Sequence, residues 1–293
     1  MAAAPTLGGR FCRGTAPGVI RIDVAAVDRG LAGAPWGGDI HAAWRRLAPA
    51  CTADGVPLAA LDALAREGAL RSGRGLALRF VAADSVRFDA YEAHIAGTGE
   101  VPTRTAGPAG LHDLLNALAW LAWPLTKARL NAVQAAVIEH DGIAGRRGAV
   151  RDAATVFDEN AAVLVTDDEE LVAALRARDW RRLFVERREA FRARASVRLF
   201  GHALVQKLFT PYKAICAHAW VASLPADAPT PVVDAWLAAR FARAAPSLAD
   251  AHPLPVLGVP GWSSGNEDPA FYDDQAVFRP PGRRAARRDR RPG

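Results

Sequence analysis

Lysine and asparagine are scarce in this sequence. Its 293 residues include 34 Arg but three Lys and four Asn, and alanine is abundant. This bias is typical of a gene rich in GC codons, which deplete Lys and Asn. We therefore expect each retained Lys or Asn to be needed for its side chain. Three of the seven lie within residues 111–134: Asn116, Lys127 and Asn131.

Cysteine is scarce too. Cys12, Cys51 and Cys216 are widely spaced and form no Cys-x-x-Cys pair. This pattern is typical of a reducing compartment and provides neither a disulfide framework nor a zinc signature. The N-terminus has no apolar run of signal-peptide length, and no apolar stretch is long enough for a bilayer. We therefore expect a cytoplasmic protein with no membrane partner.

The excess of positive charge is confined to one end of the chain. There are 37 basic and 31 acidic residues, and the last fifteen residues hold seven Arg and one Asp, which leaves the rest formally neutral. A neutral body argues against a nucleic-acid-binding fold, although the Arg tail would contact phosphates weakly and without sequence specificity. A solvated tail is the simpler interpretation. We expect disordered ends at 1–19 and 281–293 around one domain at 20–280.

Hydrophobic patterning predicts a mainly helical protein with some strand. Helices are expected from about Asp39 and Pro57, among others. Alternating patterns at 76–95 and 151–166 predict two short β-hairpins, the second with its turn at 158–160. The expected fold class is a single α+β domain, mainly helical, with a kinked central helix and these two hairpins.

Residues 111–134 form the predicted central helix. Pro124 cannot donate a backbone hydrogen bond, so we expect the helix to kink there. One side of the helix is lined by leucines, and the other has polar and aromatic groups at steps of three or four. An ordinary solvent face would have Glu, Lys and Arg, so these groups line a pocket or form an internal network. They are His112, Asn116, Trp120, Trp123, Lys127, Asn131 and Gln134.

Five segments resemble those of a known family. They are VPTR at 101–104, HDLLNALAWLAWPLTKARLN at 112–131, RRGAVRDAATVFDEN at 146–160, FGHAL at 200–204, and LPVLGVPGW with NEDPAFYDDQAVFRP near 254–280. In this order they are similar to the bacterial family classed as domain of unknown function 3025, over roughly residues 22–280. Members of the family tend to have Trp at the position of Leu111 and Gly at the position of Ala161, so this sequence departs from the family pattern at both positions. The family has no assigned function, and the resemblance implies no mechanism.

His112, Asp113 and His202 are the candidate catalytic residues. An imidazole titrates near neutral pH and can transfer protons. The alternative is that His112 and Asp113 begin the central helix, whose dipole favours an acid, and that His202 is a hydrogen-bonded structural residue. The sequence has no Gly-x-Ser-x-Gly elbow, so it does not support a nucleophilic triad.

Seven residues are candidates for ligand binding. Arg104, Lys127 and Arg151 would form an anion clamp, with asparagine amides orienting the ligand. The alternative is that these cations form salt bridges with nearby aspartates. The candidate set is Arg104, Asn116, Lys127, Asn131, Arg151, Asp152 and Asp158.

A metal site is not predicted. Asp152, Asp158 and Glu159 near a histidine would suit a divalent cation, but no template such as His-Glu-x-x-His is present. We expect a pocket for a small anionic or polar ligand, in a hydrolase or transferase that uses histidine acid–base chemistry; the sequence names no cofactor. The alternative is a noncatalytic interaction or scaffold protein whose His, Asn and Trp stripe is a buried structural network.

Overall fold

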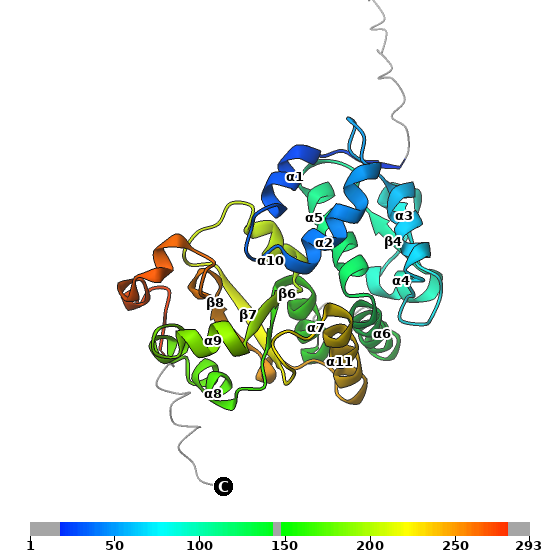
Figure 1. The fold of residues 1–293 in the computed structure, drawn as a ribbon. Helices are drawn as coiled ribbons and strands as arrows, with labels where there is room; N and C mark the ends of the chain where they lie inside the picture. The colour runs from blue at the N-terminus through cyan, green and yellow to red at the C-terminus, as the bar shows by residue number, and fades with distance from the viewer. Residues whose placement is uncertain (1–17, 143–147, 281–293) are drawn as a thin grey trace, which may run out of the picture.

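A computed structural model describes residues 18–142 and 148–280 (Figure 1). Most of the predicted arm, 1–17, and the whole predicted tail, 281–293, lie outside the described residues. Val19, at the end of that arm, pairs with Pro57 in a short strand.

The fold is mainly helical α+β, as the sequence predicts. The helices of the first half are α1 (Val24–Leu31), α2 (Gly38–Leu47), α3 (Leu58–Glu67), α4 (Tyr91–Thr98), α5 (Gly107–Ala122) and α6 (Pro124–Asp141). Those of the second half are α7 (Ala149–Asn160), α8 (Glu169–Ala177), α9 (Arg188–Arg194), α10 (His202–Lys207) and α11 (Thr230–Arg243). The strands are β1 (Val19–Ile20), β2 (Val56–Pro57), β3 (Arg79–Ala82), β4 (Glu100–Thr103), β5 (Ala161–Val165), β6 (Ser196–Leu199), β7 (Cys216–Ala222) and β8 (His252–Pro255).

The central helix is divided, which confirms the predicted kink. It ends at Ala122 and resumes as α6 at Pro124, with Trp123 between them outside the helical region at φ −130° and ψ 53°. The α6 N-terminus has no cap from its own chain segment. Asp234 of α11 takes that role, since its carboxylate accepts hydrogen bonds from the backbone N–H groups of Leu125 and Thr126 at 2.9 and 2.8 Å. α5 itself is buried on both faces, as expected of a helix that is apolar nearly all round.

The larger sheet has the strand order β6-β5-β7-β8. β5 runs parallel to β7 and antiparallel to β6, and every residue of β5 is buried. Successive side chains of a strand face opposite sides. Accordingly Ala162 and Leu164 join one hydrophobic core and Val163 joins another, on the other side of the sheet. In Figure 1 the N-terminal helices, blue to cyan, lie at one end, and the sheet with the C-terminal segment lies at the other.

Both predicted hairpins are wrong. β3 pairs with β4 in parallel, because the chain between them forms α4, which ends at Gly99 in the left-handed conformation at φ 76°. Residues 151–160, expected to be a strand and a turn, lie within α7. Its buried residues Ala153, Ala154 and Phe157 follow steps of three and four, which is helical spacing, and only the following β5 is a strand.

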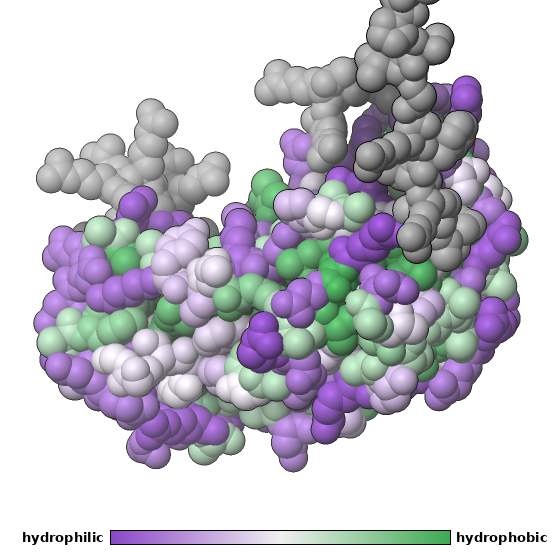
Figure 2. All heavy atoms as spheres, turned by 90° about the horizontal axis from the view of Figure 1, so that it is seen from above, coloured by the Kyte–Doolittle hydropathy of each residue, from purple (hydrophilic) through white to green (hydrophobic). Residues whose placement is uncertain are grey.

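The surface of the described residues is mixed in polarity. On the face shown in Figure 2, hydrophobic residues gather towards the middle, with hydrophilic residues among and around them. Within residues 18–142 and 148–280, no helix combines the length and the hydropathy that crossing a membrane requires.

Candidate functional site

The polar side of the central helix faces a cavity of about 530 Å³. α5 supplies His112, Asp113 and Asn116 to its wall, and α10 supplies His202. The remaining residues used below come from α4, α7 and the segment after β4: Tyr91, Glu92, Arg104, Arg151, Asp158 and Glu159. Seven of the predicted site residues line this cavity, and its Tyr and two Glu residues were not among those predicted.

Two histidines meet at this wall. The Nε2 atoms of His112 and His202 lie 3.1 Å apart, with the rings edge to face. Nδ1 of His112 lies 3.0 Å from Oε1 of Gln206, one turn further along α10. Nδ1 of His202 is buried without a hydrogen-bond partner in the described residues, and its nearest carboxylate oxygen is Oδ2 of Asp158 at 3.8 Å. Burial is the main cause that lowers the pKa of His202, to about 4, so its ring is neutral near pH 7.

Gly201 sets the position of His202. Its backbone N–H donates to the carbonyl of Ala161 at 2.9 Å, at the junction of α7 and β5. A Cβ at Gly201 would lie 2.5 Å from the nitrogen of Ala161 and 2.6 Å from the carbonyl oxygen of Glu159. These contacts are too short for any side chain. The glycine therefore allows α10 to begin directly against the end of α7, where the acidic residues of the site lie.

Lys127 and Asp158 form a buried ion pair beneath the histidines. Nζ of Lys127 donates to Oδ1 of Asp158 at 2.5 Å and to Oδ1 of Asn116 at 2.7 Å. Nδ2 of Asn116 donates to the hydroxyl of Tyr91 at 3.1 Å. Burial alone would raise the pKa of Asp158, but the charge of Lys127 and the nearby imidazoles outweigh it, so this pKa is lowered. Lys127 therefore forms a salt bridge instead of an anion-binding site, which is the alternative that the sequence left open.

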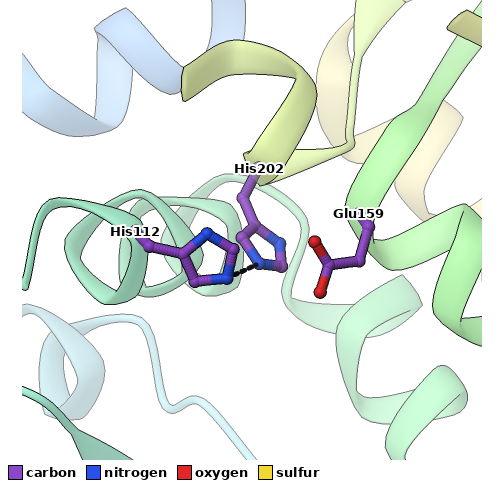
Figure 3. Close-up of side chains that lie close together, drawn as sticks. All are labelled: His112, Glu159 and His202. Carbon is purple, nitrogen blue, oxygen red and sulfur yellow. Dashed lines mark hydrogen bonds between the residues drawn. The ribbon is translucent and has the colours of Figure 1, made fainter. Parts of the chain in front are cut away.

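Glu159 completes a cluster with the two histidines. Ligand atoms of His112, Glu159 and His202 all lie within 4.8 Å of one another. Figure 3 shows the three side chains converging from three separate helices, with the Glu159 carboxylate directed towards the rings. Burial raises the pKa of the Glu159 carboxyl group. The sequence placed Glu159 among the acids of a hypothetical cation site, but it did not identify this set.

Of the predicted anion clamp, Arg151 alone remains available among the described residues. Arg104 is bound to Asp113 through Nε at 2.9 Å and Nη2 at 2.6 Å, and its backbone N–H donates to the same carboxylate at 2.7 Å. Asp113, a predicted catalytic residue, is therefore occupied in holding the loop before α5. Arg151 lines the cavity, and its buried Nε has no partner among the described residues.

Besides Lys127, two more of the predicted ligand-binding residues lie outside the cavity wall, Asn131 and Asp152. Asn131 donates to the backbone oxygen and the carboxylate of Glu92 at 2.9 and 2.7 Å, and accepts from the N–H of Gly73 at 2.8 Å. These contacts tie α6 to α4 and to the loop before β3. Asp152 is exposed on α7. Neither residue belongs to the cavity lining.

The cavity has an excess of formal negative charge. Its wall contains five carboxylates, against two guanidinium groups and the Lys127 ammonium behind it. Burial is the main cause that raises the pKa of Glu92, and the charge of Asp158 adds to it. The acidic balance means that a simple anion would meet repulsion everywhere except near Arg151.

A second cavity, of about 520 Å³, lies along β7 and β8, around Cys216 and His218. Asn160 bridges to the Nδ1 atom of His218 at 2.9 Å. Within the described part of the chain, the sole group of three His, Cys, Asp or Glu side chains close enough to share a metal ion is that of His112, Glu159 and His202. The first cavity is therefore the stronger candidate for chemistry.

Comparison with known proteins identifies the family and gives no activity. No curated protein and no solved structure matches the chain. The family model described as a protein of unknown function, DUF3025, matches residues 78–283, which begins later than the resemblance from residue 22 would imply. The matched region contains the cavity residues of α4, α5, α7 and α10. The chain therefore belongs to the DUF3025 family.

Proposed function

We propose that the protein is an enzyme that binds a small polar or anionic molecule in the cavity and catalyses hydrolysis or group transfer. The observation that supports this most is the convergence of His112, Glu159 and His202 on the wall that Arg151 also lines. The cluster would activate a water molecule or a substrate hydroxyl, by accepting a proton or by holding a metal ion. Arg151 would bind a carboxylate or phosphate group of the ligand, since its guanidinium group offers paired donors.

The concentration of reactive groups at the cavity wall favours an enzyme over a purely structural role. Side chains that only stabilise a core are expected to satisfy each other. Asn116 and Lys127 do so, but the buried Nδ1 of His202 and Nε of Arg151 do not, within the described residues. Unsatisfied polar atoms beside a cavity are characteristic of a site that a ligand completes.

A thermal-shift screen tests this proposal. The wild-type chain would be screened against carboxylates, phosphosugars and nucleotides, because a ligand that binds only the folded state raises Tm by mass action. We expect at least one compound to raise Tm in the wild type and not in Arg151→Ala. Arg129→Ala, which removes an exposed Arg of α6, is the matched control and should keep the shift. A shift that survives Arg151→Ala would place the ligand elsewhere.

A noncatalytic scaffold is the second candidate. The bonds among Asn116, Lys127 and Asp158, and those of Asn131 to Glu92, favour it, because they join α4, α5, α6 and α7 into one buried network. Under this proposal no small molecule shifts Tm, and substitution at the network lowers stability alone.

We also propose a cytoplasmic setting, which the free thiols of Cys51 and Cys216 support. Nucleic acid would bind, if at all, only through the tail at 281–293, which lies outside the described residues. Gel-shift measurements before and after deletion of the tail test this, since binding that persists without it would implicate the body.

A further inference from the structure

We propose that His112, His202 and Glu159 bind a divalent first-row transition metal ion, with Zn²⁺ as the reference ion. This metal site deepens the proposed function. A catalytic role for the ion rests on the proposed function, but binding of the ion does not. The ligand set is two imidazoles and a carboxylate, which suits Zn²⁺ and related ions better than Mg²⁺ or Ca²⁺.

The two ring protons of the neutral pair can serve the contact to Gln206 and the contact between the Nε2 atoms, but they leave none for Nδ1 of His202, which faces Asp158 at 3.8 Å. Oε1 of Gln206 and the carboxylate of Asp158 both favour an N–H at the Nδ1 atom that each faces. If both Nδ1 atoms are protonated, the two Nε2 atoms face each other at 3.1 Å with lone pairs only. Two neutral imidazoles carry two ring protons, so they cannot also form an N–H···N bond between the Nε2 atoms. A cation at the Nε2 atoms removes this conflict and allows both Nδ1–H groups to face oxygen.

The geometry is close to that of a metal site. Two ligands at tetrahedral positions around Zn²⁺ are about 3.3 Å apart, given Zn–N lengths of about 2.05 Å. The Nε2 atoms are 3.1 Å apart, and the carboxylate of Glu159 lies within the same 4.8 Å group. The Glu159 carboxylate would have to move by up to about 1.5 Å towards the imidazoles to reach the tetrahedral separation. These residues line the cavity, so positions on the ion remain open to water or to a ligand oxygen.

Residues behind the cluster would orient its imidazoles. Metal-bound histidines usually donate their other ring N–H to a carboxylate or carbonyl oxygen, which fixes the ring. Here Asp158 is behind His202, and it is itself fixed by Lys127 at 2.5 Å. The side-chain amide oxygen of Gln206 is behind His112. Nδ1 of His112 therefore has the oxygen partner that metal ligation requires, and Nδ1 of His202 faces a carboxylate that lies 3.8 Å away, just beyond hydrogen-bond distance.

The charge of the cavity provides independent support. Its five carboxylates exceed the two guanidinium groups and the Lys127 ammonium by two negative charges, which a divalent ion would neutralise. A bound ion would also let an anionic ligand enter this wall, because the ligand would then meet a cation beside Arg151.

Metal titration of the full-length chain tests the site without an activity assay. The protein would be stripped with chelator, dialysed, and titrated with Co²⁺ while its visible d–d bands are recorded, then with Zn²⁺ in competition. We expect one equivalent of Co²⁺ to bind, and Zn²⁺ to displace it. His112→Gln and Glu159→Gln should each weaken binding by more than about 100-fold. Replacing a residue that only hydrogen-bonds a metal ligand usually weakens binding by about 10- to 100-fold, so a larger loss identifies a direct ligand. His140→Ala, which removes an exposed histidine of α6, is the control and should bind as the wild type does.

Two results would overturn the metal proposal. One is the absence of stoichiometric binding of Co²⁺ or Zn²⁺ to folded wild type. The other is binding that His112→Gln and Glu159→Gln leave unchanged, since the ion would then lie elsewhere. If His202→Ala fails to fold, these two variants still decide, because both positions are only partly buried.

The same samples separate this proposal from the proposed function. A ligand-induced Tm shift that persists in chelator, with no metal binding, would remove the metal and keep the ligand pocket. Stoichiometric metal binding that depends on the three residues, with no Tm shift from any screened compound, would keep the metal site while the enzyme proposal lost its support.

Discussion

Two buried polar networks in this protein are built around asparagines, and their surroundings differ. One joins Asn116 to Lys127 and Asp158 beside the cavity. The other surrounds Asn266, a fully buried residue in the C-terminal segment. Nδ2 of Asn266 donates to the backbone oxygens of Leu257 and Val259 at 2.8 and 2.7 Å, and its Oδ1 accepts from Arg188 at 3.2 Å.

The difference lies in what each amide binds. Asn266 binds mostly backbone, so it fixes the path of a segment with little regular structure. Asn116 binds two side chains, and those lead on to the histidine cluster. An Asn or Lys that is retained despite the GC-rich composition therefore indicates that its side chain is needed. It does not indicate whether the side chain stabilises the fold or takes part in binding or catalysis. The neighbouring cavity is what favours a chemical role for the Asn116 network, since the Asn266 network also has an unsatisfied buried nitrogen, Nε of Arg188, among the described residues.

Lys127→Met is expected to have the largest effect. It leaves the buried carboxylate of Asp158 without its cation, which should lower the free energy of unfolding by about 3 kcal/mol. Urea denaturation measures this. Lys207→Met, at an exposed lysine of α10, is the control. A loss below about 1 kcal/mol would show that solvent in the cavity screens the pair.

Asn266→Ala should lower the free energy of unfolding by about 2 kcal/mol, because it strands two backbone oxygens and part of Arg188. It should leave Co²⁺ affinity unchanged in the folded protein, because Asn266 is not part of the cavity wall. Urea denaturation and Co²⁺ titration of the same preparation measure both quantities. Loss of Co²⁺ binding from folded Asn266→Ala would mean that the two networks are coupled.

Asn116→Ala should cost less, about 1 kcal/mol of unfolding free energy, because water from the cavity can reach the groups it leaves. The same denaturation experiment measures it. A loss above about 2 kcal/mol would make the Asn116 network as structural as that of Asn266, in favour of a scaffold.

Glu267→Ala should have the smallest effect on the free energy of unfolding, because exposed ion pairs contribute little to stability. Its ion pairs with Arg188 and Arg192, at 2.6 and 3.0 Å, lie at the exposed edge of the Asn266 network. Denaturation at low and high salt measures the effect, and a cost near that of Asn266→Ala would show that the charge pair holds the segment.

The periodicity of the central helix predicted much of the site. Steps of three and four placed His112 and Asn116 on one face, and Pro124 predicted the break that turns Lys127 back towards them. Glu159 was misplaced in a turn because α7 was taken for half of a hairpin. Helix and strand patterns are hard to distinguish in a short segment that mixes Ala, Thr and Val, and tertiary packing decided the outcome.

Other parts of the site depend on contacts between distant segments. Gln206 meets His112 across 94 positions of sequence, and Asn131 meets Glu92 across 39. Neither partner has a local signal, since each pairing follows from how α10 packs on α5 and α4 on α6. The role of Gly201 is equally invisible in sequence, where it reads as an ordinary glycine before a helix.

The position of Gly201 has a consequence for the synthesis of the protein. When a ribosome has completed α7, the chain already has His112 and Glu159, but His202 is still absent. The two histidines are 90 positions apart, and contacts of such long sequence separation form late in folding. In the folded protein the closed cluster is accompanied by the pairing of β6 with β5 and by the contact of Gly201 with the end of α7. A nascent chain would therefore complete its cavity wall only after much of its helical half has had time to fold.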